Sequence, residues 1–132
     1  MINVLDSYAL LAYLEKDVDY EIVENVLQKA ANGKLSLLLT TVNWGEVYYI
    51  VLREYGKDKA DQIEDLLQSF PIEIIPVDKG LAREAAKIKA VTSIAYADCF
   101  AAALSKAKKA KLITGDPEFK KLEKDISIVW LR

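Results

Sequence analysis

The sequence has no histidine and only one cysteine, Cys99, among its 132 residues. Without histidine, the chain cannot form a Ser-His-Asp or Cys-His catalytic site, a zinc–histidine site or a histidine acid–base pair. A single cysteine excludes an intrachain disulfide, and we interpret Cys99 as a packed thiol because its thiolate is disfavoured beside Asp98 in an apolar run. Carboxylates are therefore the side chains left for chemistry.

The chain also lacks long apolar runs and a strong net charge. No segment approaches the ~20 consecutive apolar residues of a membrane span, and Met1 leads into a strand-like run without a basic leader. We therefore expect a cytoplasmic protein with no membrane association. The 20 acidic and 18 basic residues give a formal charge of -2, so any contact with nucleic acid must be local.

Glycine and proline are scarce, at 5 and 3 residues, and 52% of the chain is apolar. This composition is typical of one compact domain, which we expect to span residues 1–132 without a linker or an internal repeat. Short apolar runs alternate with helical patterns along the chain. The expected strands cover residues 2–5, 35–39, 72–77, 111–114 and 126–130, and the expected helices cover residues 8–14, 19–32, 43–55, 58–69, 78–91, 94–104 and 117–122.

Strands and helices alternating at this spacing predict an α/β fold of three layers, α/β/α, with a central parallel sheet of four to five strands. In such sheets, sites form beyond the carboxyl ends of the strands, at a topological switch point. Asp19 and Asp78 are expected to cap the helices that follow them, and Pro76 suits an edge strand. The helix at residues 43–55 is apolar nearly all round, so either this domain buries it fully or one face meets a second subunit or a partner.

Asp98 is the one residue of the stretch Ile94–Leu104 that does not suit a dry core. An ionised carboxylate among small apolar neighbours is costly unless a metal, a cation or several donors hold it. The alternative is an Asp98 near the helix start, where the helix dipole favours it and solvent reaches it.

Three further acids are expected at the same edge of the sheet, and each has a structural alternative. Asp6 follows the first strand and suits a helix N-cap, Glu46 suits the partner of Asn43 in a capping box, and Asp116 suits an N-cap before Pro117. However, no basic residue lies beside Asp6, Glu46 or Asp98 in the sequence. Clustered carboxylates raise one another's pKa unless a cation lies between them, and hard cations such as Mg²⁺ or Mn²⁺ prefer oxygen ligands.

Four motifs resemble those of the PIN-domain ribonucleases, and especially the short VapC-type toxins of toxin–antitoxin pairs. In order, they are Val4-Leu5-Asp6-Ser7, Asn43-Trp-Gly-Glu46, Tyr96-Ala-Asp98-Cys-Phe-Ala-Ala-Ala-Leu104 and Leu112-Ile-Thr114-Gly-Asp116-Pro-Glu-Phe119. The resemblance implies a Mg²⁺- or Mn²⁺-dependent endoribonuclease with Asp6, Glu46, Asp98 and Asp116 as its acids. It also implies Ser7 and Thr114 as polar support, an RNA substrate, a homodimer and a cognate antitoxin protein. One departure is Gly115, where many relatives carry a larger polar or basic residue.

On this hypothesis, Asp6 and Asp98 bind the metal directly, Glu46 binds it or orients the attacking water, and Asp116 completes the site or a second metal position. We favour Asp116 over Glu118 as the fourth acid because Glu118 should lie one turn into the helix. The basic run Lys106, Lys108 and Lys109 is either a rim that follows the RNA phosphates or a solvated helix end.

Other classes fit less well. A haloacid-dehalogenase-type phosphatase needs a second Asp where Tyr8 stands, and a phosphoacceptor receiver needs paired acids after its first strand. A non-catalytic protein-interaction or RNA-binding domain of the same fold, using the aromatic helix Trp44–Tyr55, remains the alternative.

Overall fold

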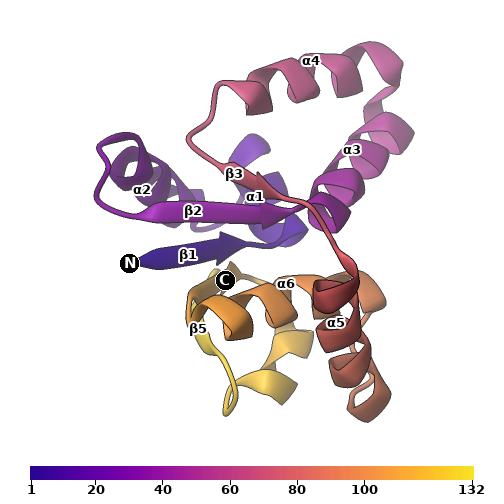
Figure 1. Ribbon diagram of the computed structural model, residues 1–132. Coiled ribbons are helices and arrows are strands. Elements are labelled where there is room, and N and C mark those ends of the chain that lie inside the picture. The colour runs from indigo at the N-terminus through magenta and orange to yellow at the C-terminus, as the bar shows by residue number, and fades with distance from the viewer.

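The computed structural model describes residues 1–132, which form five strands, six α-helices and one 3₁₀ helix (Figure 1). The strands are β1 (Ile2–Leu5), β2 (Ser36–Thr40), β3 (Glu73–Ile75), β4 (Lys111–Thr114) and β5 (Ser127–Trp130). The helices are α1 (Ser7–Leu14), α2 (Tyr20–Ala31), α3 (Thr41–Tyr55), α4 (Lys57–Gln68), α5 (Lys79–Val91), α6 (Tyr96–Lys108) and the 3₁₀ helix η1 (Pro117–Leu122).

All five strands are parallel, in the order β3-β2-β1-β4-β5. This confirms the predicted α/β/α fold with a parallel sheet. β3 is shorter than the expected strand at residues 72–77, and it lies at one edge of the sheet, where Pro76 follows it. An edge position suits proline because an edge strand does not need every backbone donor.

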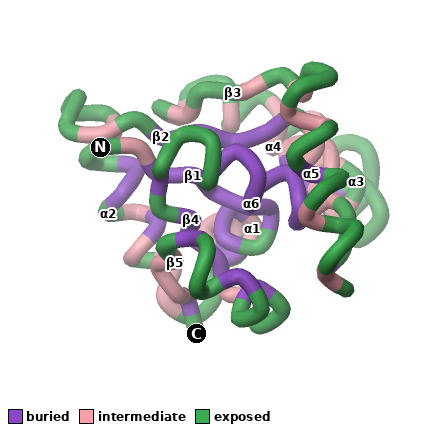
Figure 2. Tube along the Cα trace, turned by 60° about the horizontal axis from the view of Figure 1, so that its bottom comes forward, coloured by how far each residue is buried: buried purple, intermediate pink, exposed green.

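Alternate strand residues fill two separate cores, as the period of two in a strand requires. Val4, Leu38 and Leu112 point to the face covered by α5, α6 and η1. Leu5, Leu39 and Ile113 point to the opposite face, which is covered by α1, α2, α3 and α4 (Figure 1). Buried residues concentrate in the central strands and in α6 (Figure 2).

The strand order reverses direction between β1 and β4, and this point positions the site. The two strands are neighbours, with Leu5 opposite Ile113. From β1 the chain continues into α1 on one face, and from β4 it continues into η1 on the other face. The carboxyl ends of β1 and β4 therefore lie side by side at a topological switch point, the place where open sheets of this kind form their sites.

Three local expectations are corrected by the structure. α3 begins at Thr41 instead of Asn43, because Thr40 is its N-cap and accepts a hydrogen bond from the backbone N–H of Asn43 at 3.0 Å. Asp19 precedes α2 but makes no side-chain cap; its φ is 63°, and its carboxylate accepts from the backbone N–H of Arg132 at 3.1 Å. The helical spacing of Ile63, Leu66 and Leu67 predicts that Leu66 of α4 points inward, but Leu66 is 44% exposed. By contrast, Asp78 caps α5 as expected, through the N–H of Leu81.

α3 is not fully buried by this domain. Val47 and Val51 lie in the core, but Tyr49, Leu52 and Tyr55 are 49%, 40% and 60% exposed. Of the two alternatives, full burial is therefore wrong, and α3 presents an apolar face to the outside.

No single helix is both long and apolar enough to cross a membrane. α5 and α6 reach that length and apolarity only as a pair, across a bend of 118°.

Candidate active site

Asp6 joins the ends of β1, α1 and β4. One carboxylate oxygen accepts from the backbone N–H of Ala9 at 2.8 Å, so Asp6 is the N-cap of α1. The other accepts from the hydroxyl of Thr114, at the end of β4. Asp6 is 1% exposed, and Thr114 is fully buried. The capping role is therefore real, and it leaves the carboxylate at the switch point between the two strands.

Glu46 lies in the second turn of α3 and faces α1. The hydroxyl of Ser7 donates to Glu46 Oε1 at 2.5 Å, and Asn43 Nδ2 lies 3.5 Å from the same oxygen. The expected Asn43–Glu46 capping box is wrong, because Thr40 caps the helix. Glu46 is thus held from one side by Ser7 and Asn43, with its second oxygen free.

Asn43 connects three elements, a role that sequence reasoning missed. It is fully buried, its Oδ1 accepts from the Thr40 hydroxyl at 2.6 Å, and its Nδ2 donates to the backbone carbonyl of Ala97 at 3.3 Å. Ala97 immediately precedes Asp98 in α6. Asn43 therefore fixes the start of α3, and with it Glu46, against the part of α6 that carries Asp98.

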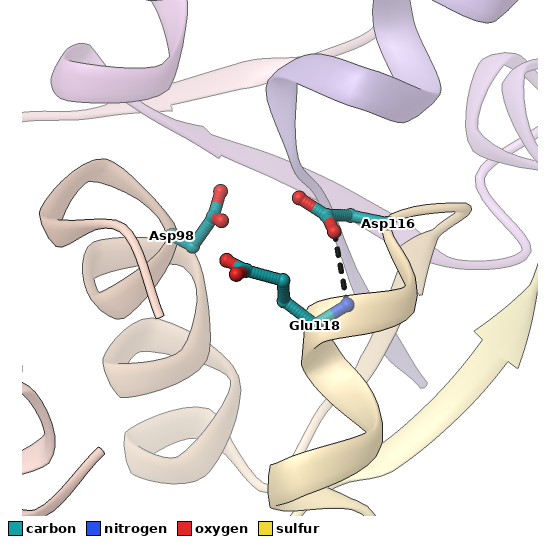
Figure 3. A group of neighbouring side chains, drawn as sticks. All are labelled: Asp98, Asp116 and Glu118. Atoms are coloured by element: carbon teal, nitrogen blue, oxygen red, sulfur yellow. Dashed lines mark hydrogen bonds between the residues drawn. The ribbon is translucent and has the colours of Figure 1, made fainter. Parts of the chain in front are cut away.

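Asp98 is the third residue of α6 and is 7% exposed. Its carboxylate lies near those of Asp116 and Glu118, with one oxygen of each within 4.8 Å of the others (Figure 3). Asp116 follows β4 and caps η1 by accepting from the N–H of Glu118 at 3.0 Å. Three carboxylates, one from α6 and two from the start of η1, thus face one another.

Glu118 is the acid that the sequence interpretation favoured less than Asp116 as the fourth acid of the site. The expectation was that it lies one turn into the helix, but it is the second residue of η1. At the start of this short helix, its side chain reaches back toward Asp98 (Figure 3). Asp116 and Glu118 both belong to the acidic cluster, so the choice between them does not arise.

The electrostatics of the cluster are unfavourable. Burial raises the pKa of Asp6 to about 7, against the hydrogen bonds from Thr114 and Ala9, and repulsion from Asp116 and Glu46 adds to the increase. Burial likewise raises the pKa of Asp98 to about 8, followed by repulsion from Asp116, Asp6 and Glu46. The four ion pairs of the protein all lie elsewhere, at Arg53–Glu54, Lys57–Asp61, Lys87–Glu84 and Arg132–Asp19.

The donor set suits a hard divalent cation. All the converging ligands are carboxylate oxygens, with no sulfur or imidazole among them, and Mg²⁺ and Mn²⁺ prefer oxygen. Asp98 is buried and carries no protein cation beside it, so a metal ion is the counter-charge that the geometry admits. Asp98, Asp116 and Glu118 form the closest group of ligands, and Asp6 and Glu46 border it.

The lysines considered for RNA contact lie far from these acids. Lys106 and Lys108 are in the last turn of α6, and Lys109 ends it, whereas Asp98 is in the first turn. At 1.5 Å per residue, the separation along the helix axis is about 12 to 17 Å. All three lysines are exposed.

The family model of the PIN domain matches residues 4–125 of the chain. Among solved structures, the chain is similar to VapBC2 from Rickettsia felis bound to a promoter DNA fragment, with 20% identity, a TM-score of 0.80 and 100% of both chains covered. It is similar to Mycobacterium tuberculosis VapC20, described as a sarcin–ricin-loop-cleaving toxin, with 15% identity, a TM-score of 0.70, and 90% and 93% covered. It is also similar to FitAcB from Neisseria gonorrhoeae, with 20% identity, a TM-score of 0.70, and 97% of this chain and 96% of that chain covered. No curated protein sequence matches the chain.

The raised pKa values predict how the stability of the metal-free protein depends on pH. Because both folded-state values lie above the ordinary value of 3.8, the protonated carboxyls stabilise the fold. This contribution is complete below the unfolded-state pKa and is lost as the pH rises through about 7 and about 8. With EDTA present, the midpoint temperature of thermal unfolding should therefore decrease as the pH is raised from 5 to 9. Circular dichroism measures this midpoint.

Asp98→Asn should flatten that profile and raise the midpoint at high pH, because the buried negative charge is gone. If the wild type and the Asp98→Asn variant lose stability in parallel as the pH rises, Asp98 is not the source of the pH dependence.

Asn43 is predicted to support metal binding as well as stability. Asn43→Ala removes the partner of the Thr40 hydroxyl and of the Ala97 carbonyl, which should cost about 1–3 kcal/mol of unfolding free energy. It should also weaken Mn²⁺ binding about 10- to 100-fold in calorimetry, because Glu46 and the start of α6 lose their alignment.

Ser105→Ala is the matched control for Asn43→Ala. Ser105 is also buried and donates to the Ala101 carbonyl within α6, away from the acids. This variant should lose stability without losing Mn²⁺ affinity. Equal losses of affinity in the two variants would assign Asn43 to the fold alone.

Proposed function

The chain belongs to the PIN-domain family, and on that premise we propose that it is a metal-dependent endoribonuclease, the toxin of a toxin–antitoxin pair. One observation carries the proposal: the buried carboxylates of Asp6 and Asp98 and the half-buried carboxylate of Asp116, none of them in an ion pair, converge at the switch point of the sheet. Among the similar structures, the one described as cleaving the sarcin–ricin loop supports RNA as the substrate class. A cytoplasmic location follows from such a substrate.

We assign Mg²⁺ or Mn²⁺ to Asp98, Asp116 and Glu118, with Asp6 and Glu46 next to them. When bound, such an ion lowers the pKa of a coordinated water and neutralises charge on the phosphate oxygens. The acids in turn depend on their own supports: Thr114 holds one oxygen of Asp6, and Ser7 holds one oxygen of Glu46.

The residues of the chain then orient the reaction. Glu46 is half-buried, and Ser7 occupies one of its oxygens, which leaves the other to accept a hydrogen bond from the attacking water. The oxygen of that water forms a bond to phosphorus and gives up a proton to Glu46, while the bond from phosphorus to the 3′-oxygen breaks and the leaving 3′-oxygen takes up a proton from solvent. The products are a 5′-phosphate and a 3′-hydroxyl. The absence of histidine agrees with this route, because the 2′-hydroxyl then needs no general base.

Cleavage of single-stranded and hairpin RNA should require Mn²⁺ or Mg²⁺ and stop in EDTA. Asp98→Asn should lower the cleavage rate by more than the 10- to 100-fold that is typical of residues that only support a metal ligand. End-group analysis of the fragments should find 5′-phosphates, and Ser105→Ala should cut at the wild-type rate.

Cutting by Asp98→Asn at the wild-type rate would refute the nuclease assignment. A wild type that binds RNA or protein but takes up no Mn²⁺ would favour the alternative, a non-catalytic interaction or RNA-binding domain of the same fold.

We further propose that the protein pairs with a cognate antitoxin and forms a homodimer. Several similar structures are VapBC complexes, including one from Mycobacterium tuberculosis described as a member of that toxin–antitoxin family. An apolar cavity of about 410 Å³ lies between α1, α3 and α4 and is lined in part by Leu11, Val51, Tyr55 and Ile63. It suits an apolar segment of the antitoxin, and the exposed Tyr49 and Leu52 leave apolar surface on α3 for a second copy of the chain.

Sedimentation velocity tests both partners. The 14.8 kDa chain alone should sediment as a dimer, and addition of the protein encoded by the adjacent reading frame should give a heavier complex that no longer cleaves RNA. Tyr55→Glu should weaken that complex, whereas Val18→Glu, which is exposed outside the cavity, should not. A chain that sediments as a monomer and does not bind the neighbouring protein would contradict both the homodimer and the antitoxin complex.

A further inference from the structure

Tyr8 and Gly115 form a contact that the acidic cluster does not explain. The Tyr8 ring lies so close to Gly115 that a Cβ at that position would overlap it. Gly115 has an ordinary backbone conformation, with no positive φ, so it is the Tyr8 ring that a side chain at residue 115 would have to displace. The missing side chain at residue 115 and the presence of a tyrosine at residue 8 are therefore one structural feature.

This contact places an aromatic ring beside the acids. Tyr8 follows Asp6 and Ser7 in the first turn of α1, and Gly115 lies between Thr114 and Asp116. Thr114 and Asp6 are hydrogen-bonded, so the start of α1 and the turn that carries Gly115 are held side by side. Tyr8 is 40% exposed. Its ring therefore presents an accessible aromatic surface next to the candidate cleavage site.

A second aromatic surface borders the same turn. A shallow cavity of about 310 Å³ is lined by Gly115, Pro117, Lys120, Trp130, Leu131 and Arg132. Trp130 is half-buried, and its indole N–H donates to Glu123 Oε2 at 3.1 Å, which fixes the ring. Lys120 is exposed and makes no ion pair. Aromatic rings together with a lysine that makes no ion pair are the groups that hold single-stranded nucleic acid without reading its sequence.

We propose that Tyr8 and the cavity of Trp130 and Lys120 form a subsite for single-stranded RNA, in which a nucleobase next to the cleaved bond stacks on Tyr8 and Lys120 contacts a phosphate. The subsite rests on the proposed nuclease function and deepens it. It places the RNA strand across the turn that carries Gly115, instead of along α6 toward Lys108 and Lys109. Glycine at residue 115 is then the condition for the stacking surface.

The experiment measures binding by fluorescence anisotropy in the Asp98→Asn background with Mn²⁺, so that the probe is not cut. One probe is a fluorescein-labelled 12-nucleotide oligoadenylate, and the other is a 12-unit abasic sugar–phosphate oligomer. Tyr8→Ala should weaken binding of the oligoadenylate about 5- to 100-fold and leave the abasic oligomer unchanged, because only the stacking is removed. Tyr8→Phe should bind both probes like the parent protein.

Lys120→Glu should weaken binding of both probes. It should also make the slope of log binding constant against log salt concentration shallower, by about 0.7 for each phosphate that the variant no longer neutralises. The double charge reversal Lys108→Glu with Lys109→Glu is the matched control and should have the smaller effect, since these lysines lie at the far end of α6.

A double-mutant cycle tests whether Gly115 and Tyr8 act together in binding the oligoadenylate. Gly115→Ala should weaken binding of the oligoadenylate, because its Cβ displaces the Tyr8 ring. In a Tyr8→Ala background, the same substitution should have no further effect. Thermal unfolding of each variant checks the fold, and Mn²⁺ titration of the same substitutions with Asp98 restored checks the metal site; both should match the corresponding parent protein if Tyr8 acts by stacking.

The outcomes separate the subsite from the nuclease function. If the wild type cleaves RNA and Tyr8→Ala binds the oligoadenylate as tightly as the parent, the subsite is wrong and the nuclease stands. If Tyr8→Ala weakens the two probes equally, or loses Mn²⁺ affinity, its role is structural and the subsite is also wrong. If the wild type neither binds nor cleaves RNA, both proposals fall together.

Discussion

The cost of gathering carboxylates at one edge of the sheet governs this structure. Asp6 and Asp98 are 1% and 7% exposed, and neither has a lysine or arginine in an ion pair. Burial and mutual repulsion raise both pKa values far above the ordinary range, so ionising the two carboxyls opposes folding. A bound divalent cation would reverse the sign of that contribution, because the same carboxylates would be its ligands. Metal binding and folding stability would then be coupled through one group of atoms.

The structural roles of these acids do not compete with a chemical role. Asp6 and Asp116 each accept the backbone N–H of a helix start, which is the ordinary work of an N-cap. An ionised carboxylate has about four acceptor positions on its two oxygens, so a cap and a hydroxyl from Thr114 still leave capacity on Asp6. Helix starts follow strand ends in this architecture, and capping acids therefore collect at the switch point before any chemistry is asked of them.

Local patterns predicted the elements of the fold but not the contacts between them. The strands at Ile2–Leu5 and Lys111–Thr114 match their predicted ranges, because each is a short apolar run between polar breaks. The sequence also pointed to Asp98, whose charge interrupts an apolar helix. It did not predict the position of Glu118 or the links of Asn43 to α6, because both depend on how η1, α3 and α6 pack together. The Thr40 cap was missed because Thr40 is both the last residue of β2 and the N-cap of α3. No loop residues separate the strand from the helix, so the sequence does not mark where one ends and the other begins.

If the proposed subsite is correct, the pairing of Tyr8 with Gly115 explains how a chain of net charge -2 holds a polyanion. Lysines placed close to five acids would pair with them and weaken their hold on a cation, so phosphate contacts near the cleaved bond must be few. A neutral aromatic ring has no such conflict, because stacking on a base does not change the charge around the metal ligands. Removing the side chain at residue 115 makes room for that ring. The departure from the common family pattern at this position is then a change in how the substrate is held, from charge to stacking.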